Sequence, residues 1–277
     1  MKTRIISSLV MVPTLILLFL GGPFILAGAL IVTLIALHEF TNAFGDKKPA
    51  LWVGYVSIAL LYIGYVIFPH SEILLSAWFF LVIVLSFLSM FSMDKRTLMQ
   101  GFATFVSVFY VVFLVFHIVL VDSSFSTKIS TSIGLDITGL HSYVWIIVLT
   151  AFGTDIFAYF VGVMFGKHKL CPVISPKKTV EGAIGGLVGS VILCGLFGYF
   201  FIPEGFVNCI ILGVLGGVTS QLGDLSASIM KRKLEIKDWG AIIPGHGGIL
   251  DRFDSVLFTA PTVYYFLLIE STVENML

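Results

Sequence analysis

Long apolar stretches separated by short polar ones run along the whole chain of 277 residues. A hydrocarbon core of about 30 Å needs roughly 20 apolar residues per helix, and the sequence divides into about nine such stretches. They lie near residues 5–21, 24–44, 51–69, 73–92, 101–121, 142–165, 182–202, 206–230 and 255–270. Long unbroken apolar runs favour helices, because a helix pairs every backbone N–H and C=O within its own segment. The pattern predicts an all-α, polytopic membrane helix bundle with about nine transmembrane helices.

Composition supports a membrane protein. Hydrophobic residues make up 58% of the chain and charged residues 12%, and the mean hydropathy is +1.05, which leaves too little polar surface to cover a soluble globule. A formal net charge of zero argues against nucleic-acid binding, which needs a basic excess. The expected partners are membrane lipids and small molecules, with no nucleic acid. Lys2 and Arg4 precede an apolar run as in a signal peptide, but no convincing small-residue cleavage site follows, and we interpret this run as the first span.

The basic residues predict the orientation, because short loops rich in lysine and arginine stay on the cytoplasmic side. If nine spans alternate, only Lys128 falls on the opposite face. All other lysines and arginines fall together on one face: Lys2, Arg4, Lys47, Lys48, Lys95, Arg96, the lysines of 167–178 and the group from Lys231 to Arg252. We therefore expect a multi-pass protein of the cell (inner) membrane with its active site on the cytoplasmic face, a cytoplasmic N-terminus and an external C-terminus.

The two halves of the chain differ in character. Residues 1–141 read as plain apolar helices, about five spans, with short loops. Residues 142–277 hold about four spans, bring glycine and polar residues into them and have longer loops, so we expect the catalytic half there. The cysteines Cys171, Cys194 and Cys209 have no CxxC spacing and are interpreted as small buried hydrophobes.

Ionisable side chains at membrane depth are costly and therefore mark candidate sites. Glu39 lies near the cytoplasmic end of the second span, where its side chain can reach the interface. His117 is interpreted as a buried, hydrogen-bonded histidine. Asp155 and Asp224 are either site residues or an interhelical hydrogen-bonding pair.

The segment from Met230 to Asp254 contains groups suited to a divalent cation. Asp251 and Asp254 are spaced i, i+3, so both carboxylates should point to one side of a helix. Such oxygen ligands suit Mg²⁺, which takes one or two carboxylates and completes its shell with water and substrate phosphates. Asp224 would supply a third carboxylate.

The same segment contains groups suited to phosphate. Gly245, Gly247 and Gly248 would let backbone N–H groups approach an anion at a helix N-terminus. Positive charge for nucleotide or lipid phosphates would come from Lys231, Arg232, Lys237 and Arg252. Taken singly, these features are equally explained by a membrane anchor, an ordinary turn or a surface ion pair; their combination indicates a site.

The residues just before Gly182 predict the start of a helix. Thr179 is the expected N-cap, and Glu181 in the first turn would interact favourably with the helix dipole. The glycines that follow recur at helical spacing and are interpreted as close-packing faces between helices. They are Gly182, Gly185, Gly186 and Gly189, and in the next span Gly213 and Gly217.

The C-terminal half of the sequence resembles a known family, the phosphatidate cytidylyltransferases, also called CDP-diacylglycerol synthases. The C-terminal signature of that family is matched without departure by Ser228-x-Met230-Lys231-Arg232, Lys237-Asp238-x-Gly240, Ile243-Pro244-x-His246-Gly247-Gly248-Ile249 and Asp251-Arg252-Phe253-Asp254. An upstream stretch, from Asp155 to Gly166-Lys167 and from Ser175 to Gly182, is also similar. The resemblance covers about the last 125 residues with high specificity.

The resemblance implies that a phosphatidate oxygen attacks the α-phosphorus of CTP, giving CDP-diacylglycerol and pyrophosphate. It implies one or two divalent cations, Mg²⁺ being expected, leaves a monovalent cation open, and by analogy implies a homodimer. The metal ligands carried over are Asp224, Asp251 and Asp254. The catalytic set adds Lys237, Asp238, His246 and Arg252, and His246 is expected to donate a hydrogen bond to a phosphate. The substrate-binding set is Lys167, Ser175, Lys177, Lys178, Thr179, Ser228, Lys231, Arg232, Gly247 and Gly248.

Two other functions compete with this prediction. A transporter or channel would use Asp155 and Asp224 in an ion path, but the phosphate-type loop would then have no role. A CDP-alcohol phosphotransferase would show DGxxAR followed by GxxxDxxxD, and the sequence contains neither.

Overall fold

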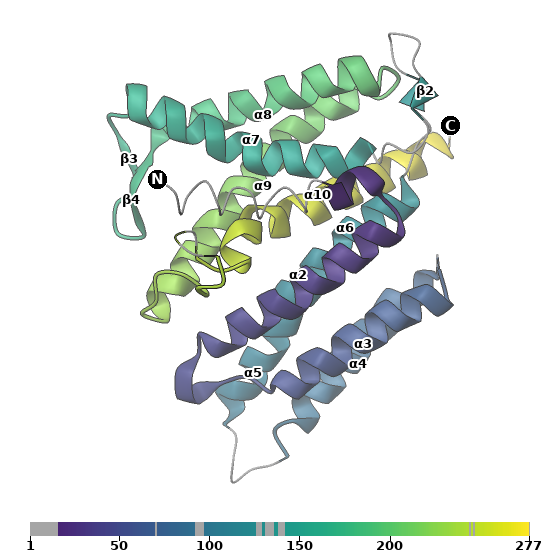
Figure 1. Ribbon diagram of the computed structural model, residues 1–277, viewed down its shortest axis with the longest axis vertical. Helices are drawn as coiled ribbons and strands as arrows, with labels where there is room; N and C mark the ends of the chain where they lie inside the picture. The colour runs from purple at the N-terminus through teal and green to yellow at the C-terminus, as the bar shows by residue number, and fades with distance from the viewer. Residues whose placement is uncertain are drawn as a thin grey trace.

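Helices dominate the computed structural model, which describes residues 16–69, 71–91, 97–125, 129–130, 136–137, 142–243, 245 and 247–276 (Figure 1). Residues 16–20 are helical. The further helices are α2 (Pro23–Asn42), the short 3₁₀ helix η1 (Gly45–Lys47), α3 (Leu51–Ile67), α4 (Glu72–Leu88), α5 (Leu98–Ser107), the π-helix η2 (Val108–Phe113), α6 (Leu114–Ser124), α7 (Ser142–Phe165), α8 (Val180–Phe201), α9 (Phe206–Lys233) and α10 (Leu250–Glu274). The strands are β1 (Ile129–Ser130), β2 (Asp136–Ile137), β3 (Lys169–Cys171) and β4 (Ser175–Thr179).

The predicted all-α membrane class is confirmed. Six helices of the described residues are long and apolar enough to cross a membrane, namely α2, the continuous helix Leu98–Ser124, α7, α8, α9 and α10. The apolar helices α3 and α4 are shorter, at 17 residues each. Most of the predicted span 5–21 lies outside the described residues, so the count of nine stays a prediction. The protein is a multi-pass membrane protein.

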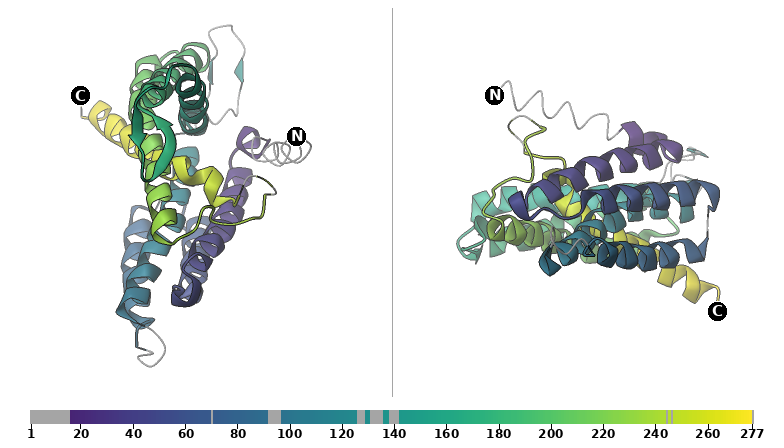
Figure 2. Two further views of the ribbon diagram at one scale, coloured as in Figure 1. Left: turned by 90° about the vertical axis from the view of Figure 1, so that its left-hand side faces the viewer. Right: turned by 90° about the horizontal axis from the view of Figure 1, so that it is seen from below.

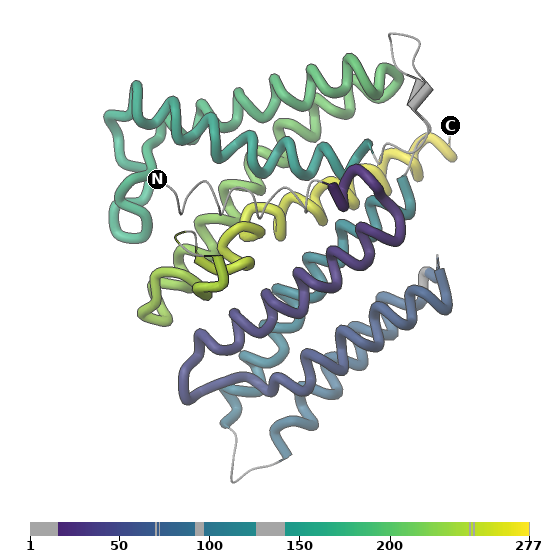
Figure 3. Tube along the Cα trace, viewed as in Figure 1, coloured from purple at the N-terminus to yellow at the C-terminus, as the bar shows by residue number. Residues whose placement is uncertain are grey.

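Helix α10 lies between two groups of helices (Figures 1 and 3). It packs against α9 and α7 on one side and against α6 and α2 on the other. In the first group α7, α8 and α9 contact one another; in the second, α2, α3 and α4 run side by side, as the right-hand view of Figure 2 also shows. The division of function at residue 141 stays a prediction, although α10 joins the second half of the chain tightly to the first.

The predicted glycine faces are confirmed as close helix contacts. A Cβ at Gly189 would lie 2.2 Å from the ring of Phe157, and one at Gly213 would lie 2.9 Å from the backbone of Val191. Side chains at these positions would force α8 away from α7 and α9. Cys194 and Cys209 lie free and fully buried in the same region, as predicted for small hydrophobes.

The predicted role of His117 is also confirmed. Its ring is fully buried in α6, and Nδ1 donates to the backbone carbonyl of Phe113 at 2.8 Å. It is packed among aromatic rings, including those of Tyr264 and Tyr265. These contacts make His117 part of the core.

Three of the connections that were predicted to be basic lie together at one end of the bundle; Lys2, Arg4, Lys95 and Arg96 lie outside the described residues. The α2–α3 turn (43–50), the segment with the β3–β4 hairpin (166–179) and the α9–α10 loop (234–249) gather at the left of Figure 1, whereas the α8–α9 turn and the end of α10 lie at the right. We call the left end the basic end. This arrangement agrees with the predicted alternation of the spans after residue 23.

Candidate active site

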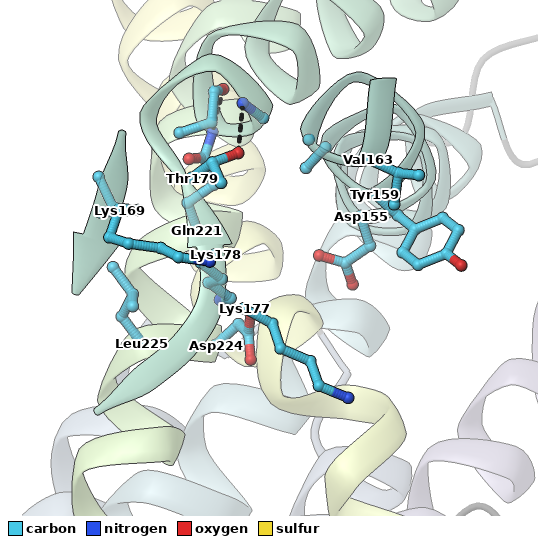
Figure 4. A pocket seen from close by; sticks show the side chains of 15 residues that line it. Asp155, Tyr159, Val163, Lys169, Lys177, Lys178, Thr179, Gln221, Asp224 and Leu225 are labelled. Carbon is cyan, nitrogen blue, oxygen red and sulfur yellow. Dashed lines mark hydrogen bonds and ion pairs between the residues drawn. The ribbon is translucent and has the colours of Figure 1, made fainter. Parts of the chain in front are cut away.

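A cavity of about 470 Å³ opens at the basic end between α7, α8, α9 and the hairpin (Figure 4). Helix α7 contributes one face, because residues 155, 158, 159, 162 and 163 recur at helical spacing. Polar lining comes from Asp155, Lys169, Lys177, Lys178, Thr179, Gln221 and Asp224, and apolar lining from Ala158, Tyr159, Val163, Leu170, Ala183 and Leu225. The cavity thus combines three cationic side chains and two carboxylates with an apolar wall.

Lys178 is at the centre of the charges in this cavity. It forms an ion pair with Asp224 of α9 and interacts electrostatically with Asp155 and Asp254. Burial lowers the pKa of the Lys178 ammonium, and the carboxylates of Asp155 and Asp254 oppose that shift. In Figure 4 Asp155 points from α7 into the space between the helices, and its carboxylate accepts a hydrogen bond from the Ser255 hydroxyl of α10 at 3.4 Å.

The hairpin is fixed to the start of α8 by two side chains. The predicted N-cap is confirmed, since the Thr179 hydroxyl accepts from the backbone N–H of Gly182 at 3.1 Å. Glu181 accepts from the backbone N–H of Lys167 at 3.1 Å and from Nδ1 of His168 at 2.6 Å. These bonds hold the lysine-bearing strand β4 over the cavity.

Lys231 joins α9 to the first turn of α10. Its ammonium lies 2.8 Å from Oδ1 of Asp251 and 4.0 Å from Oδ2 of Asp254. The i, i+3 spacing therefore places both carboxylates on one side of the helix, as predicted. The side chains of Lys231 and Asp251 are 11% and 5% exposed, so this ion pair is well shielded from water.

Asp251 also organises the α9–α10 loop. Its Oδ2 accepts from the backbone N–H groups of Trp239 at 2.8 Å and Gly248 at 2.9 Å. Between them, the backbone N–H of Ile243 donates to the carbonyl of Gly247 at 2.9 Å, and Gly247 has a φ of +84°, which only glycine adopts easily. The signature glycines thus close a compact turn around an aspartate.

Glu39 reaches this loop from α2. The residue is 4% exposed, and its carboxylate accepts from the backbone N–H groups of Ile249 at 3.1 Å and Leu250 at 2.9 Å. The N-terminus of α10 therefore interacts with a carboxylate of the protein itself. The amide of Gly248 likewise donates to Asp251. Of the predicted anion-binding amides, that of Gly248 is therefore engaged inside the protein, which gives Gly248 a structural role here; the anion-binding role of Gly245 and Gly247 stays a prediction.

The three predicted metal ligands are not brought together. Both oxygens of Asp251 are engaged by Lys231 and the loop, and Asp224 is paired with Lys178. Within the described ranges, no group of three or more His, Cys, Asp or Glu side chains is arranged to hold a metal ion. As arranged, Asp224, Asp251 and Asp254 do not fit a preformed metal site, and their predicted role in metal binding stays untested.

The remaining predicted residues are spread around the basic end. Lys167, Lys237 and Asp238 are exposed, and Ser228 is half-buried on α9. Arg232 is exposed and donates to the carbonyl of Ile236 at 3.2 Å. Arg252 lies near enough to Asp155 to interact with its charge, Ser175 pairs with Cys171 in the hairpin, and Lys177 lines the cavity. His246 lies outside the described residues.

Three residues of the site were absent from the metal, catalytic and substrate-binding sets carried over from the family resemblance, although Asp155 and Glu39 were among the ionisable candidates. Asp155 and Lys169 line the cavity, and Glu39 holds the start of α10. The signal for Asp155 and Glu39 was present, since both are ionisable residues in apolar stretches. Lys169 carried no signal beyond its place in a basic loop.

Comparison with known proteins identifies the family. The sequence profile of the cytidylyltransferase family matches residues 2–270. The chain is 33% identical over 294 aligned residues to the phosphatidate cytidylyltransferase of Synechocystis, covering 99% of both chains. It is 34% identical to that of Staphylococcus haemolyticus over 96% of this chain and 97% of the relative. A match to the Bacillus subtilis enzyme is 46% identical but covers 48% of this chain and 49% of that one. The chain belongs to the cytidylyltransferase family.

Proposed function

We propose that this protein transfers the cytidylyl group of CTP to phosphatidate. The family and the names of the relatives that match nearly the full chain support this activity. The observation that carries it is the cavity at the basic end, because it places three lysines and two carboxylates beside an apolar wall. A reaction between a water-soluble nucleotide and a membrane lipid requires such a boundary.

The reaction is a displacement at phosphorus. An oxygen of the phosphatidate phosphate attacks the α-phosphorus of CTP, a new P–O bond forms, and the bond from the α-phosphorus to the oxygen bridging to the β-phosphorus breaks. Pyrophosphate leaves and CDP-diacylglycerol remains. The chain need not supply a general base, because a phosphate monoester has a second pKa of about 6 and is largely dianionic near neutral pH. Positioning and charge stabilisation are the tasks left to the protein.

The lysines of the cavity suit the lipid phosphate. Lys169, Lys177 and Lys178 provide the positive charge, while Tyr159, 67% exposed on α7, and Val163 border the apolar surface that would face acyl chains. Lys178 would exchange part of its interaction with Asp224 for the phosphate. The more exposed Arg232 and Lys237 at the same end are available to the CTP phosphates.

A divalent cation, Mg²⁺ or a chemical equivalent, is proposed as the cofactor on the basis of the family resemblance alone, since the described carboxylates do not form a preformed metal site. When bound, it would neutralise triphosphate charge. Chelation should abolish product formation and added Mg²⁺ should restore it; full activity in excess chelator would remove the cation from the proposal.

The cellular arrangement is proposed from the distribution of charge. The basic end faces the cytoplasm of the cell that carries this protein in its inner membrane, with the N-terminus inside and the C-terminus outside. This orientation would give CTP access to the cavity from the cytoplasm. A homodimer is proposed by analogy with the family, not from the charge distribution.

The activity is tested with purified protein, phosphatidate and Mg²⁺ and with CTP labelled at either the α- or the γ-phosphorus. Label from the α-position should enter the lipid fraction, and label from the γ-position should appear in pyrophosphate. Diacylglycerol in place of phosphatidate controls for the lipid phosphate and should give no product. Absence of lipid-bound α-label under conditions that keep the protein folded would reject the proposal.

A further inference from the structure

The carboxylate of Glu39 lies at a junction between distant parts of the chain. It comes from α2, is almost fully buried, and accepts from the first backbone N–H groups of α10, which are more than 200 positions away in sequence. A buried carboxylate is costly unless donors surround it. Here the two amides and the positive end of the helix dipole stabilise it.

Two glycines of the α9–α10 loop are shaped around this carboxylate. A Cβ at Gly240 would lie 2.4 Å from Oε1 of Glu39, and one at Gly248 would lie 2.4 Å from Oε2. Such distances exclude any side chain while Glu39 keeps its place. Phe40, next to Glu39, adds a ring contact of 4.9 Å between centroids with Trp239. The end of α2 therefore contacts the loop through two neighbouring residues, Glu39 and Phe40.

The same loop is held from the other side by Asp251, through the amides of Trp239 and Gly248. The Glu39 and Asp251 carboxylates thus fix the loop at both of its ends, and the loop bears Lys237 and Asp238 between α9 and the turn. Movement of Glu39 would shift the first turn of α10 and with it Asp251 and Asp254.

We propose that Glu39 is a positioning residue for cytidylyl transfer: it aligns the α9–α10 loop and the first turn of α10 with the cavity, without touching a substrate. This inference rests on the proposed function. It predicts an effect on turnover more than on lipid binding, because the cavity lysines lie on β3 and β4, away from the Glu39 contacts.

Glu39→Gln is the primary test, because it keeps size and shape while replacing one acceptor oxygen with an amino group. That group would face a backbone N–H of Ile249 or Leu250, donor against donor. Misplacement of a reacting group by about 1 Å can cost on the order of a hundredfold in rate. We expect kcat to fall by about tenfold or more, with KM for phosphatidate changed by less than about twofold. Glu204 is an exposed carboxylate at the opposite end of the bundle, so Glu204→Gln should leave both kcat and the KM for phosphatidate unchanged.

Gly240→Ala tests the same contact from the loop side. Its added methyl group would meet Oε1 of Glu39, so kcat should fall as in Glu39→Gln. In a Glu39→Ala background the space is open, and adding Gly240→Ala should change kcat by less than about twofold. The matched control is Gly195→Ala, because a Cβ there would meet its nearest atom at an ordinary 3.6 Å.

The outcomes separate this inference from the proposed function. An inactive wild-type protein would reject the proposed function. An active wild type with unchanged kcat in Glu39→Gln, or with normal Gly240→Ala activity, would overturn the role of Glu39. A raised phosphatidate KM at normal kcat would also overturn it, because that result indicates substrate contact. Variants are compared per folded protein by size-exclusion chromatography; if Glu39→Gln does not fold, Gly240→Ala alone decides.

Discussion

The ion pair between Lys231 and Asp251 can be tested as a unit. Its two side chains are nearly inaccessible to water, and the charged atoms lie 2.8 Å apart. Removing one partner of such a pair leaves a buried charge without compensation, at a cost of about 3 kcal/mol. Asp251→Asn and Lys231→Met should each lower stability by that amount. Removing both partners together leaves no unpaired charge of this pair, so the double variant should lose no more than a single variant does, at most about 3 kcal/mol.

Thermal denaturation of the detergent-solubilised protein measures this difference. For a chain of this size, 1 kcal/mol corresponds to about 2 °C in Tm. Each single variant should therefore melt roughly 6 °C below wild type, and the double variant should melt no lower than the single variants. Independent effects would instead sum to roughly 12 °C in the double variant. Lys233→Met, on the exposed side of the same helix end, should shift Tm by less than about 1 °C. Additive losses would refute the pairing of Lys231 with Asp251.

Three further predictions concern the helix cap at Thr179, the charge of Lys178 and the membrane topology. Thr179→Ala removes the acceptor for the Gly182 amide and should cost about 1 kcal/mol, near 2 °C in Tm, while Thr179→Ser should retain most of it; equal losses would argue against the cap. Because burial lowers the pKa of Lys178, its charge is lost as pH rises through a value below that of an ordinary lysine, so activity should fall on the alkaline side. Lys178→Arg should move that fall to higher pH, and an unchanged pH profile would contradict the role of Lys178. A fusion reporter at residue 277 should read external, and a cytoplasmic signal would break the predicted topology.

Much of the fold followed from apolar length alone. The prediction for residues 142–165 coincides with α7, and the prediction for 182–202 is displaced from α8 by two residues at most. The reason is that a spanning helix must satisfy its own backbone, so apolar length fixes where it runs. The extent of α10 did not follow in this way. It begins at Leu250, five residues before the apolar run predicted from residue 255. The i, i+3 spacing of Asp251 and Asp254 indicates this earlier helix start, and Glu39 from α2 caps its first amides.

The site was predicted in part for a similar reason. The i, i+3 spacing placed Asp251 and Asp254 correctly on one side of a helix, since that relation is local. The partners of these carboxylates are not local: Lys231 comes from α9, and the glycine turn accommodates Glu39 from the other half of the chain. A single sequence shows a glycine-rich turn suited to an anion but does not show that the anion belongs to the protein itself.

The central claim is that cytidylyl transfer takes place at the charged cavity of the basic end. The most direct measurement is the rate at which α-labelled CTP yields lipid-bound label in wild type, Asp224→Asn and Glu204→Gln, each purified and folded. Asp224→Asn should lose nearly all product formation, while Glu204→Gln should match wild type. Full activity of Asp224→Asn would contradict this claim.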